Sequence, residues 1–254
     1  MNSFRPLDEI TQSDAFYARW SALATRVPAA INSDEVTALL GEAATVLGAD
    51  VAAFASFMRD DEHHGSYRFI LACDAMWCLE YEAGACYMQD PWLDYARHHS
   101  EPTLASRIAA RTHNEREVID LAQRFGFASA VIVPTQSPQG LTRLGALCFG
   151  SGHADYFTEA ALPAVTFAAM PLALQLHQWQ IAQLRQELLN RVRFSEDEIA
   201  ILRHLRSDRT TKEIAAAMHM TPMSVDSRLC RLNLKLGVTT RMAAANMAAE
   251  YGVI

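Results

Sequence analysis

The stretch TTKEIAAAMHMTPMSVDSRL occupies residues 210–229 and carries two helix-start signals. Thr210 is followed three residues later by Glu213, a capping box in which hydroxyl and carboxylate satisfy free amides at a helix start. Thr221 precedes Pro222, so a hydroxyl cap stands before a proline at the first helical position. Only a short joint separates the two predicted helices. Because such helices must cross steeply, the stretch predicts a helix-turn-helix.

The second of these predicted helices has one apolar face and one polar face. Val225, Leu229 and Leu232 recur at helical spacing and are expected to face the core of the domain. The polar face is typical of a helix that enters the major groove of DNA, although the spacing alone also fits a plain solvated face. The residues expected to face double-stranded DNA are Thr221, Met223, Ser224, Ser227, Arg228, Arg231 and Lys235.

The basic side chains of that set have different expected partners. Arg228 and Arg231 are placed to form forked contacts with guanine edges or with phosphates. Lys235 stands near the predicted helix end and suits a phosphate. Base reading is therefore expected from the two arginines.

Charge is distributed unevenly along the 254 residues, whose formal net charge is -7. Residues 191–254 contain ten Lys and Arg against seven Asp and Glu, a balance of +3. Residues 1–190 contain twelve against 22, a balance of -10. Because DNA phosphates repel anions, any nucleic-acid contact is expected from the basic tail alone.

The basic tail carries several short motifs in a fixed order. They read F-S-x-x-E-x-x-x-L, KEIAAAM, T-x-x-S-V-x-S-R-L, KLGV and AAEYGVI, all within residues 194–254. In these motifs the tail resembles the DNA-binding domain of LuxR-type transcription regulators, which implies a four-helix domain that reads promoter DNA. Two departures bear on affinity and sequence preference. Asp208 replaces a usual Gly, and Asp226 stands where a polar or basic residue commonly faces DNA.

Length and composition restrict the class of protein. A chain of 254 residues suits two domains, and a hydrophobic content of 50% is typical of a soluble globular protein. No apolar run reaches the roughly 18 residues of a membrane span, and the first residues lack a signal-peptide pattern. These features predict a cytoplasmic protein with no membrane contact.

The cysteines do not form a recognisable structural set. There are five, an odd number, and no C-x-x-C pair occurs. We therefore expect neither a disulfide framework nor a zinc site, and no cofactor. A metal held by Cys73, Cys78 and Cys86 is the alternative to free, half-buried thiols.

The chain before the tail alternates between helical and strand-like patterns. Helices are expected over residues 1–47, with a start at Ser33 and Glu35 and a stop at Gly48. Helices are also expected over residues 75–127, and over 157–189 with interruptions near Pro163 and Pro171. Strand-like runs occupy residues 51–59, 66–74, 129–136 and 143–151.

This order predicts an α+β protein with two domains. The amino-terminal domain is expected to be an α/β/α sandwich with a central antiparallel sheet, and the carboxyl-terminal one an all-α four-helix helix-turn-helix domain. The expected boundaries are 1–175 for the first domain, 176–193 for a helical dimerisation segment and linker, and 194–254 for the second. The stripe Leu174, His177, Ile181 and Leu184 is expected to pair in a homodimer or to pack on its own domain.

A second set of motifs lies in residues 1–190, the acidic part of the chain. Trp77-x-x-x-Tyr81 is followed by Asp90-Pro91, then by FGF, VIVP and RLGALCFG. Here the chain resembles the autoinducer-binding domain of quorum-sensing LuxR-type proteins, which encloses an acyl-homoserine lactone between a sheet and a helical layer. The resemblance implies that Trp77 donates its indole N–H to the lactone carbonyl. It also implies that Asp90 accepts the ligand's amide N–H and that Tyr81 walls the acyl chain.

Several pocket positions depart from that family's pattern. Cys73 replaces a usual tyrosine and Asp74 a usual proline. A second pocket tryptophan, expected near Ala105, is absent, and Ala130 fills a position that is usually Gly. Cys148 takes the place of a Ser or Thr that faces the ligand's amide. Each lost hydrogen-bond partner is expected to weaken recognition of the ligand's polar head by roughly 1 kcal/mol.

The sequence therefore predicts a homodimeric quorum-sensing transcription regulator that binds a lactone and an inverted-repeat promoter site. The expected ligand contacts are Trp77, Tyr81, Asp90, Cys73 and Cys148. The main alternative is a LuxR-type regulator that acts without a lactone, or with another small molecule. An enzyme built on His63-His64, His98-His99 and Cys73 is not expected, because no catalytic signature surrounds them.

Overall fold

The computed structural model describes residues 6–59, 65–136 and 143–254. The chain divides into two compact units, which are considered separately. Among the described residues, 6–57, 67–136 and 144–179 form the first unit, and 58–59, 65–66, 143 and 180–254 the second. Of the residues that the sequence singled out, His63 and His64 lie outside the described part of the chain.

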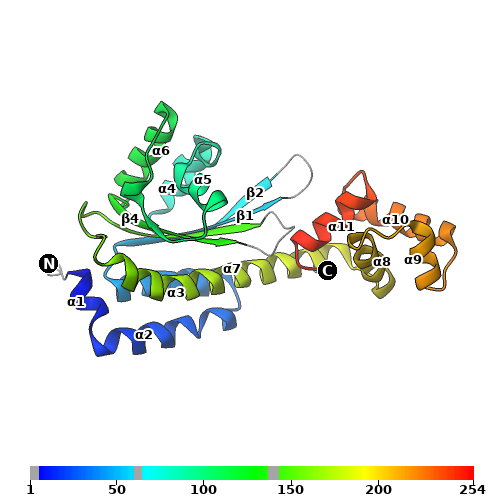
Figure 1. The fold of residues 1–254 in the computed structure, drawn as a ribbon, viewed down its shortest axis with the longest axis horizontal. Coiled ribbons are helices and arrows are strands. Elements are labelled where there is room, and N and C mark those ends of the chain that lie inside the picture. Colours follow the sequence, from blue (N-terminus) through cyan, green and yellow to red (C-terminus); the bar gives the residue numbers. More distant parts are fainter. Residues whose placement is uncertain (1–5, 60–64, 137–142) are drawn as a thin grey trace. The chain divides into compact units, whose positions relative to one another are not determined.

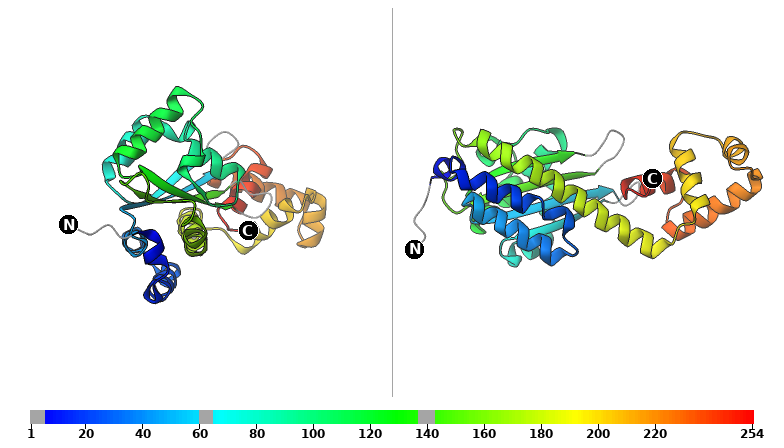
Figure 2. Two further views of the ribbon diagram at one scale, coloured as in Figure 1. Left: turned by 60° about the vertical axis from the view of Figure 1, so that its left-hand side comes forward. Right: turned by 90° about the horizontal axis from the view of Figure 1, so that it is seen from below.

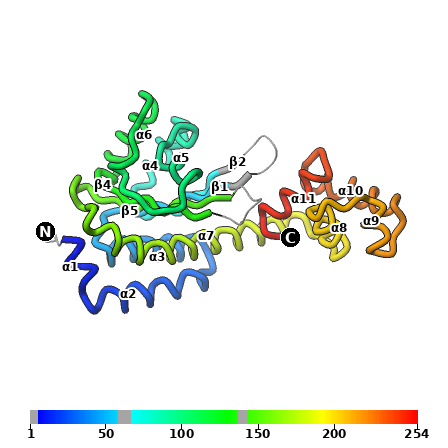
Figure 3. The backbone as a smooth tube through the Cα atoms, in the orientation of Figure 1, coloured from blue at the N-terminus to red at the C-terminus, as the bar shows by residue number. Residues whose placement is uncertain are grey.

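The first unit is organised around a sheet with strand order β2-β1-β5-β4-β3. The pairs β1 with β5, β5 with β4 and β4 with β3 are antiparallel. Figure 3 shows the chain running back and forth through these strands. The strand bounds are β1 Val51–Arg59, β2 Gly65–Ala72, β3 Thr103–Leu104, β4 Ser129–Gln136 and β5 Leu144–Ser151.

Helices cover both faces of this sheet, as Figures 1 and 2 show. The layer on one face consists of α1 Leu7–Thr11, α2 Asp14–Ala24, α3 Ser33–Leu47 and the first part of α7 Leu162–Val192. The layer on the other face consists of α4 Ala75–Ala83, α5 Pro91–His98 and α6 His113–Arg124. The predicted α/β/α sandwich is thereby confirmed. Short 3₁₀ turns occupy Val27–Ala29, Cys86–Met88 and Ala105–Arg107.

The two faces of the sheet carry side chains of different size. Alternate residues of a strand point to opposite faces, and in β1 and β5 the large ones, such as Phe54 and Leu147, pack against α3 and α7. The opposite face of the same strands carries the register pairs Ala53 with Cys148 and Ala55 with Ala146. These small side chains leave space between the sheet and the layer of α4 and α5.

The predicted start of α3 at Ser33 and its stop at Gly48 are confirmed; the Asn32 side chain supplies the cap by accepting from the Glu35 N–H at 2.9 Å, and Gly48 has φ 74°. Two other local predictions are corrected by the structure. The stretch 75–127 also contains the short strand β3. The helix α7 is continuous: Pro163 lies in its first turn, and Pro171 is exposed, where water can satisfy the carbonyl that proline leaves free.

The predicted apolar stripe on α7 does not form one exposed face. His177, Ile181 and Leu184 are buried, whereas Leu174 is 51% exposed. Three of its four members are therefore packed within the chain, and the pairing of this stripe in a homodimer stays a prediction. The exposed apolar side chains of α7 lie earlier in the helix, at Phe167, Met170 and Leu174.

The second unit contains the four predicted carboxyl-terminal helices. They are α8 Glu196–Arg206, α9 Thr211–Ala217, α10 Pro222–Leu236 and α11 Arg241–Glu250. The capping boxes at Ser195 and Thr210 are both present, and the Thr221 hydroxyl caps α10 by accepting from the Ser224 N–H. Helix starts depend on contacts within four residues, which is why the sequence predicts them correctly.

Two tight turns of the second unit use left-handed backbone at residues other than glycine. Asp208, between α8 and α9, has φ 54°, and His219, in the turn before α10, has φ 55°. Asp and His tolerate this region better than most residues with a Cβ. Asp208 is therefore accommodated in the turn between α8 and α9.

Candidate functional site: an enclosed cavity and a recognition helix

A small enclosed cavity lies on the small-residue face of the sheet, under α4 and α5. Its floor is formed by Ala53, Ala55, Ala146 and Cys148. Its other walls are mostly aromatic: Phe69, Trp77, Tyr81, Trp92 and Phe127, with Asp90 and Leu93. The free volume is about 30 Å³, space for roughly one water molecule. The aromatic side chains therefore fill most of the room that the alanines leave.

Asp90 is the only carboxylate among the residues that line this cavity, and it is 8% exposed. One oxygen, Oδ1, caps α5 by accepting from the Trp92 N–H at 2.7 Å and the Leu93 N–H at 3.3 Å. The other, Oδ2, accepts from the Tyr81 hydroxyl at 2.6 Å. A carboxylate oxygen has two lone pairs, so Oδ2 retains one acceptor position.

Trp77 and Tyr81 lie one turn apart on α4, as their spacing implies. Their rings stack with centroids 4.8 Å apart, and Phe69 meets both rings edge-on. The Tyr81 hydroxyl is occupied by Asp90, but the buried Trp77 indole N–H has no hydrogen-bond partner among the described residues. Buried polar groups are normally paired, so this N–H is a donor available to a ligand or to water.

The two predicted cysteine contacts differ in position. Cys148 lines the cavity from β5, and burial raises the pKa of its thiol well above the ordinary value. Cys73 follows β2, is half-buried and is not among the lining residues; burial raises the pKa of its thiol to about 11. Both thiols therefore stay protonated at neutral pH, where they act as weak donors.

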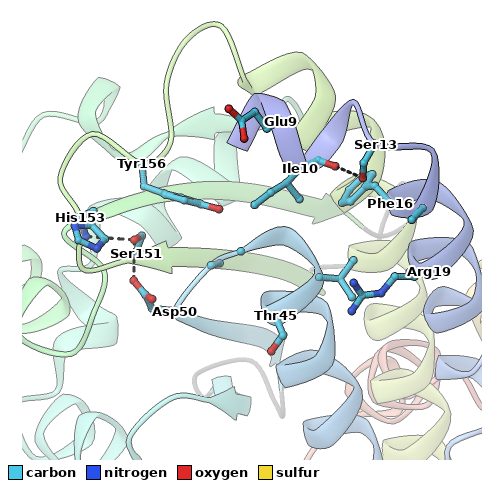
Figure 4. Close-up of a pocket in the computed structure, with 14 residues that line it drawn as sticks. Glu9, Ile10, Ser13, Phe16, Arg19, Thr45, Asp50, Ser151, His153 and Tyr156 are labelled. Carbon is cyan, nitrogen blue, oxygen red and sulfur yellow. Dashed lines mark hydrogen bonds between the residues drawn. The ribbon is translucent and has the colours of Figure 1, made fainter. Parts of the chain in front are cut away.

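A larger cleft, of about 630 Å³, opens on the other side of the sheet beside α1, α2 and the end of β5 (Figure 4). Its hydroxyl groups are already engaged: Ser151 donates to Asp50 at 2.7 Å, and Tyr156 donates to the Leu47 carbonyl at 2.8 Å. Asp50 also accepts from the Gly152 N–H at 2.8 Å. Two buried indole N–H groups without a hydrogen-bond partner among the described residues, those of Trp77 and Trp92, line the enclosed cavity, which we take as the candidate ligand site.

The polar face of α10, which the sequence predicts to face DNA, is only partly free of contacts within the unit. Met223 is 82% exposed, and Ser227 and Arg231 are exposed as well. Arg228 is less free, because its guanidinium lies 3.1 Å from the Asp197 carboxylate of α8. Thr221 uses its hydroxyl as the helix cap, and Ser224 is half-buried.

Two charged groups of α10 have partners within the unit. Lys235 donates to both oxygens of Glu198, at 2.7 and 2.9 Å, so a phosphate must compete with this ion pair. Glu198 is 6% exposed; its burial acts against ionisation, but the bonds to Lys235 and Ser195 outweigh it and lower the carboxyl pKa. Asp226 accepts from the Thr211 hydroxyl at 3.2 Å, which ties it to the start of α9.

Two family models match the chain. The autoinducer binding domain matches residues 32–178, and the model of bacterial regulatory proteins of the luxR family matches residues 192–248. The chain belongs to the LuxR family of bacterial regulatory proteins. These are transcription regulators, not enzymes.

Solved structures share the fold of this LuxR-family chain. SdiA in complex with octanoyl-rac-glycerol is 18% identical, with a TM-score of 0.72 over 95% of this chain and 98% of its own. Escherichia coli SdiA in a further crystal form is also 18% identical, with a TM-score of 0.74 over 94% and 99%. The N-acylhomoserine lactone dependent LuxR family factor CepR2 from Burkholderia cenocepacia is 11% identical, with a TM-score of 0.57 over 66% and 98%. None of the curated proteins matches the chain in sequence.

In this LuxR-family chain, the sequence prediction missed three aromatic walls of the cavity: Phe69, Trp92 and Phe127. Trp92 directly follows the Asp90-Pro91 pair, so its place at the start of a helix was the available signal. Phe69 and Phe127 come from β2 and from the residues before β4, and only the folded sheet brings them to the same cavity.

No group of three or more His, Cys, Asp or Glu is placed to hold a metal ion among the residues that the structure describes. None of the helices in that part of the LuxR-family chain is long and apolar enough to cross a membrane.

Because Asp90 is buried, the stability of this LuxR-family chain is expected to depend on pH. Burial raises the pKa of Asp90, and the bonds from Tyr81 and two backbone amides offset this only in part. A raised pKa in the folded state means that folding favours the protonated form. The contribution of Asp90 to stability is therefore full below about pH 4, the ordinary Asp value, and is lost as pH rises through the raised pKa.

We expect the unfolding free energy of the wild type, relative to Asp90→Asn, to increase as pH falls from 7 to 4. The difference between the two proteins isolates Asp90, because the other titrating groups cancel. Urea unfolding at a series of pH values measures it. A difference that stays constant over this range would show that Asp90 titrates normally.

Proposed function

We propose that the protein is a cytoplasmic quorum-sensing transcription regulator that binds an acyl-homoserine lactone and, as a homodimer, an inverted-repeat promoter site. The observation that carries the ligand part is the unpaired, buried indole N–H of Trp77 beside the Asp90 carboxylate in an enclosed apolar cavity. Membership of the LuxR family supports the DNA part.

The chemistry of a lactone fits the groups around the cavity. Trp77 donates to the lactone carbonyl, and the free acceptor position on Asp90 Oδ2 takes the ligand's amide N–H. Tyr81 and Phe69 offer apolar ring surface to the acyl chain. An acylglycerol, the class of molecule bound in the SdiA complex, offers an ester carbonyl to the same donor.

The mechanism is a linkage between ligand binding and folding. A ligand that binds only the folded ligand domain stabilises it, and this increases the population able to dimerise and bind DNA. No covalent chemistry is required. Because the cavity holds only about 30 Å³, the aromatic walls must move apart to admit a ligand.

That small volume also favours one alternative. A regulator whose own aromatic side chains fill the site needs no ligand to complete its core. Such a protein folds, dimerises and binds DNA without any lactone. The two functions make opposite predictions for the effect of added lactone on stability.

The melting temperature of the full chain is expected to rise by several degrees with one acyl-homoserine lactone in a series from short to long acyl chains. Asp90→Asn is expected to abolish this rise, because the amide presents a donor to the ligand's N–H. Differential scanning fluorimetry measures both, with 1-octanoyl-glycerol included in the series.

Asp94→Asn is the matched control, because Asp94 lies on the same helix and its side chain is 62% exposed. It is expected to keep the full ligand response. No change of melting temperature with any lactone, from a protein that already shifts DNA in a gel, would rule out the lactone hypothesis and favour the ligand-independent regulator.

DNA reading is expected to depend on Arg231 more than on Lys235. Arg231 is exposed on α10, whereas Lys235 is held by Glu198. Arg231→Ala is expected to weaken binding by about tenfold and to reduce the slope of log affinity against log salt by about one. Fluorescence anisotropy with a promoter fragment at several salt concentrations measures both quantities.

Lys235→Ala tests the predicted phosphate contact directly. If Lys235 keeps its ion pair in the complex, its removal leaves the salt slope unchanged and lowers the stability of the second unit. A slope reduced as much as by Arg231→Ala would show that Lys235 leaves Glu198 for a phosphate.

Dimerisation is proposed through an exposed apolar patch on α7 and α2. Phe167 is 71% exposed, Met170 43% and Leu174 51%, and these positions share one face of α7. Tyr17 of α2, 45% exposed, meets the Phe167 ring edge-on with centroids 6.1 Å apart. A contiguous apolar patch of this kind is typical of an interface, and a two-fold dimer uses the same patch on both copies.

A further inference from the structure

The chain holds four tryptophans, and their indole N–H groups fall into two classes. Trp20 donates to the Ala168 carbonyl at 2.8 Å, and Trp179 donates to the Ala30 carbonyl at 2.7 Å. Trp77 and Trp92 are equally buried, but neither indole N–H has a partner among the described residues. Both unpaired indoles line the enclosed cavity.

Trp92 is held firmly in place by its backbone. It follows Pro91 in the first turn of α5, and its backbone N–H is bonded to Asp90 Oδ1 at 2.7 Å. The side chain is 8% exposed, and its ring meets the Phe127 ring with centroids 6.2 Å apart. The unpaired N–H is therefore not a consequence of a loose surface side chain.

The same two rings separate the enclosed cavity from a second one. A cavity of about 260 Å³ lies next to it and is also lined by Trp92 and Phe127, together with Ala105, Ile108 and Ala130. Ligand pockets in proteins begin at about 300 Å³, a size that neither cavity reaches alone. A ligand that displaces the Phe127 ring, while Trp92 keeps its place, opens one cavity into the other.

We propose that Trp92 is a second hydrogen-bond donor to the ligand, placed at the boundary between the two cavities. The ligand is then an uncharged amphiphile with two carbonyl-type acceptors, one bonded to Trp77 and the other to Trp92. Its remaining part extends past the displaced Phe127 ring into the second cavity. This inference rests on the proposed ligand-binding function and specifies which chemistry the site selects.

The four indole N–H groups provide the direct test, because each gives its own signal in a two-dimensional ¹H–¹⁵N spectrum of the ¹⁵N-tryptophan-labelled full chain. Four single Trp→Phe variants assign the signals. On addition of N-octanoyl-homoserine lactone, the Trp77 and Trp92 indole protons are expected to move downfield as they gain an acceptor. The signals of Trp20 and Trp179 are expected to keep their positions, because those groups are already bonded.

Binding to the variants gives a second readout. Trp92→Phe is expected to lower affinity for the lactone about tenfold, since it removes one buried hydrogen bond and keeps an aromatic ring. Trp20→Phe is the matched control and keeps the wild-type affinity. For N-octanoyl-cyclopentylamine, which has a single carbonyl, only one of Trp77→Phe and Trp92→Phe is expected to lower affinity.

The experiment distinguishes failure of the Trp92 role from failure of the proposed ligand binding. A lactone that binds and moves the Trp77 signal, but leaves both the Trp92 signal and the Trp92→Phe affinity unchanged, would overturn the role of Trp92 and keep the proposed function. If neither the lactone, the cyclopentyl amide nor 1-octanoyl-glycerol moves any indole signal, the proposed function fails together with this inference. The spectrum of the wild-type chain decides the matter even if Trp92→Phe does not fold.

Discussion

Phe167→Glu combined with Leu174→Glu is expected to convert the protein to a monomer and to lower its affinity for an inverted-repeat DNA site by about a hundredfold or more. Both side chains are more than half exposed on one face of α7. Two carboxylates at a self-complementary apolar interface face their own copies, so four charges are brought together. A monomer then binds each half-site separately and loses the effective-concentration advantage of two linked readers, which is worth about 10²–10⁴.

Sedimentation velocity measures the oligomeric state, and gel shifts with full and half sites measure the DNA affinity. Gln186→Glu is the matched control, because Gln186 is an exposed polar residue about three turns beyond Leu174 on the same helix and does not share the face of Phe167 and Leu174. It adds a charge outside the apolar patch and is expected to leave the dimer intact. A double variant that still sediments as a dimer would place the interface elsewhere on the chain.

Gly150→Ala is expected to lower the unfolding free energy of the ligand domain by about 2–3 kcal/mol, within the range for overpacked cores. A Cβ at this position of β5 would stand 2.4 Å from the Phe127 ring and 2.9 Å from the Val51 side chain. A Cβ cannot lie this close to another carbon atom, so the Phe127 ring must shift. Because Phe127 is one wall of the cavity, ligand binding is expected to weaken as well.

Urea unfolding monitored by tryptophan fluorescence measures the change in stability. Gly152→Ala, two residues further on, is the matched control: its Cβ would have only the Asp50 carboxylate within reach, at 3.9 Å, an ordinary contact. It is expected to change stability by less than about 0.5 kcal/mol. Equal stability of Gly150→Ala and the wild type would mean that the Phe127 ring relaxes freely.

The helix-turn-helix unit is the part that local sequence predicts best. At each start of α8, α9 and α10 a hydroxyl side chain accepts a hydrogen bond from the backbone N–H three residues later. These are the contacts that the sequence predicts. The ion pair between Lys235 and Glu198 joins residues 37 positions apart, and sequence spacing gave no sign of it. The expected phosphate contact of Lys235 remains a prediction.

The strands of the first unit were also predicted from the sequence, because successive side chains of a strand point to opposite faces of the sheet. The short strand β3 was missed, since Thr103–Leu104 is too short to show a period. The continuity of α7 through Pro171 was missed for another reason. Whether a proline breaks a helix depends on whether the freed carbonyl can meet water, and that is decided by which face of the helix is exposed.

By itself the sequence determined the α+β architecture and the capped helices, because helical spacing and short-range caps are local. The grouping of Trp77, Tyr81 and Asp90 came from the resemblance to the autoinducer-binding domain. Only the tertiary structure decided the size of the cavity, the exclusion of Cys73 from its lining and the inclusion of Trp92 and Phe127. It also decided which α7 side chains are exposed. These features depend on which side chains of distant elements fill a shared volume, and packing of that kind has no period along the chain.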